Sequence, residues 1–321
     1  MLTRQNFVGP WAGLPVAWTA SDEFDEATYR SDVARCCQAG IPGVYTGGTS
    51  GEFYAQEWDE FQHIARATVE ECHRHGTTVM IGCTATSTRG ACRRAAFAAL
   101  IGADAVQVAM PFWMEVPDDQ LLPFMCAVAK AAGGLPISIY ETGRAKKILT
   151  VEQHFQIHKS LPQYLMVKAT QGTVGDSPDG CRALSSIVNV FVGEHRWAEL
   201  GPFGAVGSCS SVVYWNPVVM LRSWAHLREH NWLELQADCR KVSALFAGLF
   251  AAFGSRGFTD TTFDRLGGRA TGFLKTSLWN RGPYVSANES DLETMRELFR
   301  QHVPEMLYEN HLETTSAMGS R

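Results

Sequence analysis

Short apolar runs rich in β-branched and aromatic residues recur along the chain, and each predicts a buried β-strand. There are eight of them, at 14–19, 43–46, 77–83, 105–110, 135–140, 164–168, 189–192 and 203–207. Most are separated by segments in which apolar residues recur with the helical period, such as 27–39, 58–75, 90–100, 117–132 and 151–160. Strands that alternate with helices form parallel sheets, and eight such repeats favour closure into a barrel. The pattern therefore predicts an α/β fold, a (β/α)8 TIM barrel.

The last third of the chain has only the helical pattern. Apolar residues keep the helical period over 218–230, 232–253, 267–279 and 291–301. The segment 254–265, rich in Gly, Arg and Thr, predicts a loop. We therefore expect a barrel over residues 1–225 and a C-terminal helical extension over 226–321 that packs on the barrel. The last residues, 313–321, are small and polar, and we expect them to fray.

Composition and charge exclude several classes of protein. With 321 residues and 45% hydrophobic content, the chain can bury a large core. A formal net charge of −5, without any Lys or Arg run longer than two, argues against nucleic-acid and membrane-surface binding. The nine cysteines are scattered and form no CxxC pair, so no metal site is indicated. Because the first residues lack the apolar segment of a signal peptide, and no stretch is apolar enough to span a bilayer, we expect a cytoplasmic enzyme.

Two polar residues end neighbouring predicted strands. Tyr140 closes the fifth apolar run and Lys168 closes the sixth. A barrel of this kind carries its chemistry at the C-terminal ends of its strands. Burial is expected to lower the pKa of Lys168 so that its amine can attack a carbonyl, while Tyr140 moves the protons that imine formation requires. The alternative is that Lys168 packs its stem and keeps its ammonium group in water.

A glycine-rich loop follows the second predicted strand. It reads Gly-Gly-Thr-Ser-Gly-Glu-Phe over 47–53, and Gly48, Thr49 and Ser50 are its candidate binding residues. Glycines allow a tight turn in which backbone amides and two hydroxyls point at one anion, such as a carboxylate or a phosphate. The loop lacks the Gly-Lys-Ser/Thr ending of a Walker loop. An ordinary turn with Thr49 or Ser50 as a helix cap is the alternative.

In this order, these motifs resemble the dihydrodipicolinate synthase and N-acetylneuraminate lyase family, Schiff-base barrels that act on pyruvate and related 2-oxo acids. The resemblance extends from about residue 13 to 216, and it includes Gly-Glu-His at 193–195 and Gly-Ala-Val-Gly-Ser at 204–208. It implies that Lys168 forms an imine with the 2-oxo carbon and that Tyr140 relays protons. The substrate-binding residues that it implies are Gly48, Thr49, Ser50, Arg144, Gly193, Glu194 and Ser208. No cofactor and no metal are implied.

Several departures from the family pattern bear on the reaction. Phe112 and Trp113 stand where the synthase has a pair of tyrosines, Glu141 replaces an asparagine, and the spacing to Arg144 is shorter, so whether Arg144 reaches the substrate stays open. These changes argue against lysine biosynthesis. Phe53 and Tyr54 are instead similar to the loop of keto-deoxy sugar acid dehydratases. Glu194 fits either a contact with the distal half of the substrate or a solvated carboxylate at a strand end.

Three functions follow from the resemblance. The first is a lyase or aldolase that cleaves or forms a 2-oxo acid through an imine on Lys168. The alternative is a dehydratase or deaminase that acts on a keto-deoxy sugar acid or a related 2-oxo acid through the same imine. The third is a barrel that binds a 2-oxo acid without catalysis. The expected partner is the small-molecule substrate together with further copies of the chain, as a dimer or homotetramer, with Trp113 at or near a subunit contact.

Overall fold

The structure is a computed structural model, and it describes residues 2–308. The expectation that 313–321 fray lies outside these residues, as does the end of the proposed extension. Eight parallel strands form a closed barrel in which each strand pairs with the next in the chain and the last pairs with the first. The strands are β1 Gly9–Gly13, β2 Gly43–Thr46, β3 Thr78–Gly82, β4 Ala105–Val108, β5 Ile137–Glu141, β6 Tyr164–Ala169, β7 Asn189–Phe191 and β8 Ala205–Ser210. The prediction of a TIM barrel is confirmed.

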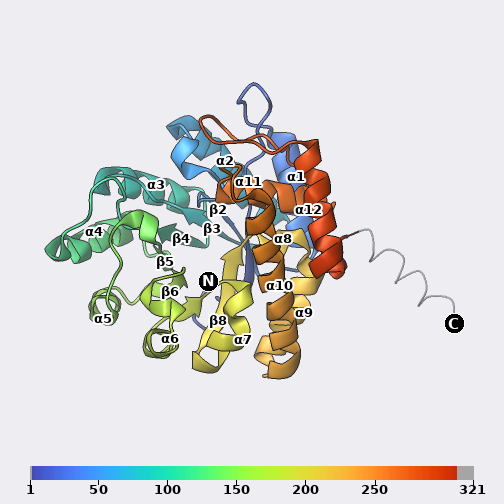
Figure 1. Ribbon diagram of the computed structural model, residues 1–321. Helices are drawn as coiled ribbons and strands as arrows, with labels where there is room; N and C mark the ends of the chain where they lie inside the picture. Colours follow the sequence, from blue (N-terminus) through green and yellow to red (C-terminus); the bar gives the residue numbers. More distant parts are fainter. Residues whose placement is uncertain (1, 309–321) are drawn as a thin grey trace.

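Helices surround the barrel and connect its strands (Figure 1). Those in the first two thirds of the chain are α1 Glu26–Gln38, α2 Trp58–Arg74, α3 Thr88–Leu100, α4 Asp118–Ala131, α5 Val151–Ser160, α6 Pro178–Ser185, α7 Trp197–Leu200 and α8 Val212–Trp215. The C-terminal helices are α9 Pro217–Arg228, α10 Trp232–Phe253, α11 Asp260–Ala270 and α12 Glu289–His302, and they lie together along one side of the barrel. A division of the chain at residues 225 and 226 falls inside α9.

The first strand lies earlier in the chain than the sequence pattern predicts. The prediction of a strand at 14–19 is wrong: β1 is Gly9–Gly13, and Trp18 makes only an isolated bridge to Phe24. The glycines of β1 resemble a turn in sequence, but Trp11 points into the barrel and is fully buried. The partner strand makes room for this ring, because a Cβ atom on Gly43 would lie 2.5 Å from it.

Helix α11 also begins earlier than predicted. The expectation of a loop over 254–265 and a helix from 267 is wrong, since α11 starts at Asp260 after a capping box formed by Thr259 and Thr262. Two adjacent glycines, Gly267 and Gly268, lie inside this helix rather than after it. They are required by packing, because a Cβ atom on Gly267 would lie 2.2 Å from the Trp215 ring. Because glycine disfavours the helical conformation, a helix that contains two glycines is not recognised from its sequence.

The barrel interior is filled at one end and polar at the other. The filled layer consists of Leu2, Phe7, Trp11, Tyr45, Met80, Ala105, Met166, Phe191 and Cys209. Next to this layer, Gln107 donates to the hydroxyl of Ser138 at 2.9 Å. Large apolar side chains thus close the barrel beneath the C-terminal ends of the strands, where a cavity opens.

Candidate active site

Lys168 and Tyr140 lie side by side near the ends of two neighbouring strands. They are direct register partners in the β5–β6 pair. The Lys168 amine lies 4.3 Å from the centroid of the Tyr140 ring and 5.9 Å from that of Tyr45. An amine held between two aromatic rings is restricted in orientation and attracted to their faces. The amine and the phenol that the sequence singles out therefore belong to one site.

The pKa of Lys168 is shifted in the opposite direction from the sequence-based expectation. Burial lowers this pKa, but Tyr140, Cys209, Asp264 and Asp260 together raise it by more, so the net change is upward. Burial also raises the pKa of Cys209 to about 12, so this thiol carries no charge at neutral pH. The expectation of a lowered pKa is wrong because the combined effect of Tyr140, Cys209 and two carboxyl groups of α11 outweighs burial.

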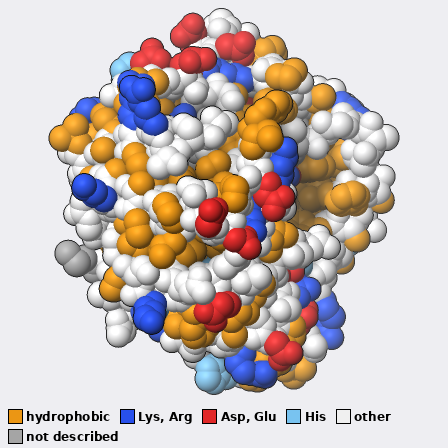
Figure 2. Space-filling model, turned by 90° about the vertical axis from the view of Figure 1, so that its left-hand side faces the viewer, with side chains coloured by type: hydrophobic (Ala, Val, Ile, Leu, Met, Phe, Trp, Pro, Cys, Tyr) orange, Lys and Arg blue, Asp and Glu red, His pale blue; other side chains and the backbone are white. Residues whose placement is uncertain are grey.

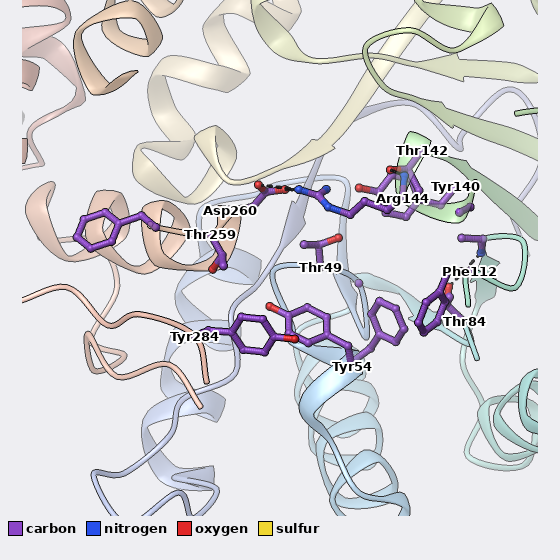
Figure 3. Close-up of a pocket in the computed structure, with 15 residues that line it drawn as sticks. Thr49, Tyr54, Thr84, Phe112, Tyr140, Thr142, Arg144, Thr259, Asp260 and Tyr284 are labelled. Atoms are coloured by element: carbon purple, nitrogen blue, oxygen red, sulfur yellow. Dashed lines mark hydrogen bonds and ion pairs between the residues drawn. The ribbon is translucent and has the colours of Figure 1, made fainter. Parts of the chain in front are cut away.

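A cavity of about 470 Å³ opens at this end of the barrel. Its wall includes four of the residues that the sequence singles out: Gly48, Thr49, Tyr140 and Arg144. In Figure 3, Thr49 lies between the Arg144–Asp260 pair on one side and the rings of Tyr54 and Tyr284 on the other. The volume is in the range of small-molecule sites.

The glycine-rich loop turns so tightly that only glycine fits at some of its positions. Gly47 has a φ of +77°, and a Cβ atom on its neighbour Gly82 would lie 2.1 Å from the Gly47 carbonyl oxygen. A Cβ atom on Gly48 would lie 2.4 Å from the Tyr45 ring. These close approaches bring the backbone of Gly48 and Thr49 to the cavity wall. Ser50 is not among the residues that line the cavity, and its hydroxyl hydrogen-bonds Asp264.

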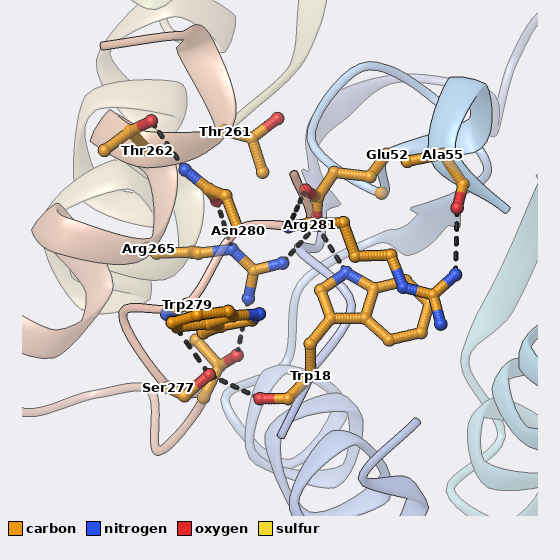
Figure 4. A network of polar contacts seen from close by, with 12 residues as sticks. Trp18, Glu52, Ala55, Thr261, Thr262, Arg265, Ser277, Trp279, Asn280 and Arg281 are labelled. Atoms are coloured by element: carbon orange, nitrogen blue, oxygen red, sulfur yellow. Dashed lines mark hydrogen bonds and ion pairs between the residues drawn. The ribbon is translucent and has the colours of Figure 1, made fainter. Parts of the chain in front are cut away.

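A buried ion pair fixes the end of this loop to α11 (Figure 4). Glu52 has a left-handed backbone with φ of +51°, and its carboxylate pairs with Arg265, both side chains being fully buried. The indole N–H of Trp18 donates to the same carboxylate. A second contact lies close by, because the Thr261 hydroxyl donates to the Thr49 carbonyl oxygen at 2.9 Å. Helix α11 is therefore a support of the loop that carries the candidate binding residues.

Arg144 reaches the cavity, and it has an acidic partner there. It lies in a short 3-10 helix, Gly143–Ala145, that follows β5. Its guanidinium group pairs with Asp260 at 3.0 Å, as Figure 3 shows. Burial lowers the pKa of Arg144, but Asp260 and the Tyr140 hydroxyl together raise it by more, so the net change is upward. Arg144 thus lies in the cavity wall and contacts the hydroxyl of Tyr140, the residue beside Lys168.

Three other residues implied by the resemblance lie near Lys168 but outside the cavity wall. Glu194 is buried and accepts hydrogen bonds from the hydroxyls of Ser208, at 2.9 Å, and Ser210. Burial raises its pKa, and Ser210, Ser208 and the positive charge of Lys168 oppose that change. Gly193 precedes Glu194 in the same turn. A direct contact of Gly193, Glu194 or Ser208 with substrate stays a prediction.

Residues 2–308 contain no cluster of three or more His, Cys, Asp or Glu side chains that could hold a metal ion. Over the same residues, none of the helices has both the length and the apolar character needed to cross a membrane.

The profile of the Dihydrodipicolinate synthetase family matches residues 7–298. The chain belongs to this family. N-acetylneuraminate lyase of Enterobacter sp. (strain 638) is 24% identical over 238 residues, which are 73% of this chain and 80% of the lyase. The expectation of a lyase, of the carbon-carbon or carbon-oxygen type, is confirmed by these matches.

Two solved structures show the same fold. YagE of E. coli K12, a prophage protein of the dihydrodipicolinic acid synthase family in complex with pyruvate, has a TM-score of 0.81 at 18% identity, over 92% of this chain and 98% of YagE. The 4-hydroxy-tetrahydrodipicolinate synthase of Methylacidiphilum fumariolicum SolV has a TM-score of 0.82 at 19% identity, over 95% of this chain and 99% of that enzyme.

Sequence reasoning missed the part of this family member's site that comes from residues 258–284, in α11 and the loops on either side of it. Asp260, Phe258 and Tyr284 line the cavity, and Asp264 is hydrogen-bonded to Ser50. None of them ends a barrel strand. The signal that was available is the i, i+4 spacing of Asp260 and Asp264, which places both carboxyl groups on one face of a helix.

Proposed function

We propose that the chain is a Schiff-base lyase of the class I aldolase type that acts on pyruvate or a related 2-oxo acid through an imine on Lys168. The observation that carries the proposal is the placement of the Lys168 amine 4.3 Å from the Tyr140 ring, beside a cavity whose wall contains the glycine-rich loop. The pyruvate bound by YagE, a protein of the same fold, supports the choice of substrate class.

In the proposed reaction, the neutral amine of Lys168 attacks the 2-oxo carbon and expels its oxygen as water. The backbone amides of Gly48 and Thr49, with the Thr49 hydroxyl, hold the carboxylate. Tyr140 carries protons to and from the carbinolamine oxygen, with the Arg144 guanidinium beside its hydroxyl. The protonated imine withdraws electrons, so that C3 of pyruvate loses a proton and becomes an enamine carbon. In the aldol direction, this carbon bonds to an aldehyde carbon, whose oxygen takes up the proton.

Intact-protein mass spectrometry after incubation with pyruvate and sodium borohydride tests the imine. We expect a reduced pyruvyl adduct on the native chain and none on Lys168→Ala, because only the Lys168 amine adjoins the candidate proton relay. Lys159→Ala is the matched control, since Lys159 is exposed on α5, and its adduct should match that of the native chain. An adduct that persists in Lys168→Ala contradicts the assignment.

A dehydratase or deaminase that uses the same imine is the second candidate. The cavity-lining residues Phe53 and Tyr54, which follow the glycine-rich loop, favour it through their likeness to the dehydratase loop. The two reactions differ in product, because an aldolase releases pyruvate from a larger 2-oxo acid whereas a dehydratase retains the carbon skeleton. Mass spectrometry of the products that the protein releases from a keto-deoxy sugar acid distinguishes the two reactions.

We propose that the chain assembles into a homo-oligomer through the face that carries Trp113. Trp113 and Met114, which lie between β4 and α4, are 73% and 74% exposed. Figure 2 views the side on which α3, α4 and α5 lie in Figure 1, and hydrophobic side chains cover much of this face among separate charged ones. Adjacent exposed apolar side chains are a feature of subunit contacts.

We also propose a cytoplasmic location, which the nine unpaired cysteines support.

Trp113→Glu should lower the molar mass measured by light scattering after size-exclusion chromatography. A carboxylate placed in an apolar contact loses its hydration without gaining a partner, so the assembly should weaken by at least about tenfold in dissociation constant. Phe250→Glu is the control, because Phe250 is 82% exposed on α10. An unchanged mass for Trp113→Glu, or a fall in mass only for Phe250→Glu, would place the contact elsewhere.

A further inference from the structure

The wall of the cavity beyond Tyr140 is aromatic. Five rings contribute to it, from segments far apart in the chain: Phe53, Tyr54, Phe112, Phe258 and Tyr284. Four of them form edge-to-face contacts with one another, with centroids 5.8 Å apart for Phe53 and Phe112 and 4.9 Å apart for Tyr54 and Tyr284. Such an array presents both ring faces and ring edges to a flat apolar group, which is the arrangement that aromatic pairs prefer.

Most hydroxyl groups on this wall already have partners within the protein. The Tyr54 hydroxyl contacts that of Thr261 at 3.2 Å, and the Thr259 hydroxyl contacts that of Thr262 at 3.2 Å. The hydroxyls of Thr84 and Thr142 accept backbone N–H groups, and the Tyr140 hydroxyl contacts Arg144. A sugar chain brings many hydroxyls that each need a partner when they leave water. The wall offers few groups that are open to such bonds.

The charges on the wall cancel. Arg144 and Asp260 are the two charged side chains among the residues that line the cavity, and they pair with each other at 3.0 Å. A second carboxylate on the substrate would have to compete with Asp260 for Arg144. The cavity therefore gives no net attraction to an anionic distal group.

We propose that the distal half of the substrate is an uncharged aryl group. The inference rests on the proposed imine function and names its second substrate: an aryl aldehyde in the synthetic direction, or a 4-aryl-4-hydroxy-2-oxobutanoate in the cleavage direction. In cleavage, the C4 hydroxyl loses its proton, the C3–C4 bond breaks, and its electron pair passes into the imine to give the enamine and the aryl aldehyde. Protonation of C3 and hydrolysis then release pyruvate.

Pyruvate consumption by the full-length protein tests this choice against three aldehydes: benzaldehyde, N-acetylmannosamine and succinic semialdehyde, an aryl, a sugar and a carboxylated aldehyde. We expect kcat/KM for benzaldehyde to exceed that for each of the other two by at least about tenfold, since a misplaced polar group in an apolar wall costs that much or more. Equal or better use of the sugar or the semialdehyde overturns the aryl proposal.

Borohydride trapping with pyruvate alone separates the two proposals. A pyruvyl adduct together with a preference for the sugar or the semialdehyde overturns the aryl assignment and leaves the imine function standing. A missing adduct overturns both. Trapping on each variant below also reports whether its imine site is intact.

Two kinds of variant test the wall itself. Phe112→Ala and Tyr284→Ala should each lower kcat/KM for benzaldehyde about tenfold, whereas Phe250→Ala, which removes an exposed ring from α10, should not change it. Asp260→Asn should release Arg144 and raise the ratio of succinic semialdehyde to benzaldehyde activity at least about tenfold. An unchanged benzaldehyde kcat/KM in both ring variants, or an unchanged ratio in Asp260→Asn, contradicts the roles assigned to the rings and to the ion pair.

Discussion

Arg265→Leu should lower the free energy of unfolding by about 3–5 kcal/mol, which is the usual cost of leaving a buried charge without its partner. The carboxylate of Glu52 would remain fully buried and lose its salt bridge. The side-chain oxygens of Asn280 and Thr276 would also lose the donors that Arg265 provides at 2.8 and 3.0 Å. Urea denaturation followed by far-ultraviolet circular dichroism measures the change.

A double-mutant cycle shows whether the ion pair itself causes this loss. Glu52→Gln with Arg265→Leu should cost much less than the sum of the two single changes, because no unpaired charge remains in the double variant. Arg300→Leu is the control, since Arg300 pairs with Glu293 and Glu297 on the exposed face of α12 and the substitution should leave the urea midpoint unchanged. Strict additivity in the cycle would mean that Glu52 and Arg265 do not depend on each other.

Glu141→Gln should make the protein more stable at alkaline pH and leave its stability at acidic pH almost unchanged. Burial raises the pKa of Glu141 from 4.5 to about 7, and the hydrogen bond from the Leu149 amide opposes that change. The folded state therefore holds this proton more tightly than the unfolded state. The stabilisation from the protonated form is complete below about pH 4.5 and is lost as the pH rises through about 7. The loss amounts to about 3 kcal/mol, because each pH unit is worth about 1.4 kcal/mol.

Urea midpoints measured between about pH 4 and pH 9 test this effect. The stability of the native chain should fall relative to that of Glu141→Gln as the pH rises, because glutamine does not ionise. Glutamine can still accept the Leu149 amide, which Glu141 accepts at 3.1 Å. Asp264 contributes in the same direction, since burial raises its pKa from 3.8 to about 7 although the hydroxyls of Ser50 and Ser211 oppose that change. Part of the slope should thus remain in Glu141→Gln. Parallel curves for the native chain and the variant would rule out a shifted pKa at Glu141.

The barrel could be predicted from the sequence because its strands are buried on both faces. Such strands are short apolar runs, and seven of the eight predicted runs overlap observed strands. The exception is β1, where Gly9 is required by close packing, because a Cβ atom there would lie 2.8 Å from Pro42 and 2.9 Å from the Trp224 ring. Helix α11 was missed for a similar reason, since Gly267 is required by contact with Trp215 and not by a turn. Close packing between distant segments is not visible in a local pattern.

The candidate site was predictable only where it depends on strand ends. Lys168, Tyr140 and the glycine-rich loop follow strands that the sequence indicates, and the barrel then places them together. Two rings of the aromatic wall, Phe258 and Tyr284, and the two aspartates come from residues 258–284, which contact the loop only after the chain has folded. Burial alone gave the wrong sign for the Lys168 pKa because Tyr140, Cys209 and these aspartates together outweigh it.

The ion pair between Glu52 and Arg265 joins residues 213 positions apart, and this separation sets an order of events during synthesis. Strand β8 ends at Ser210, so every strand of the barrel has been made before Arg265 is added to the chain. A chain emerges from the ribosome with its N-terminal part first. A nascent chain can thus close its barrel while the loop that contains Glu52 still lacks its anchor. The loop therefore acquires its final conformation late in synthesis. A chain terminated before Arg265 retains Lys168 but lacks the residue that anchors the binding loop.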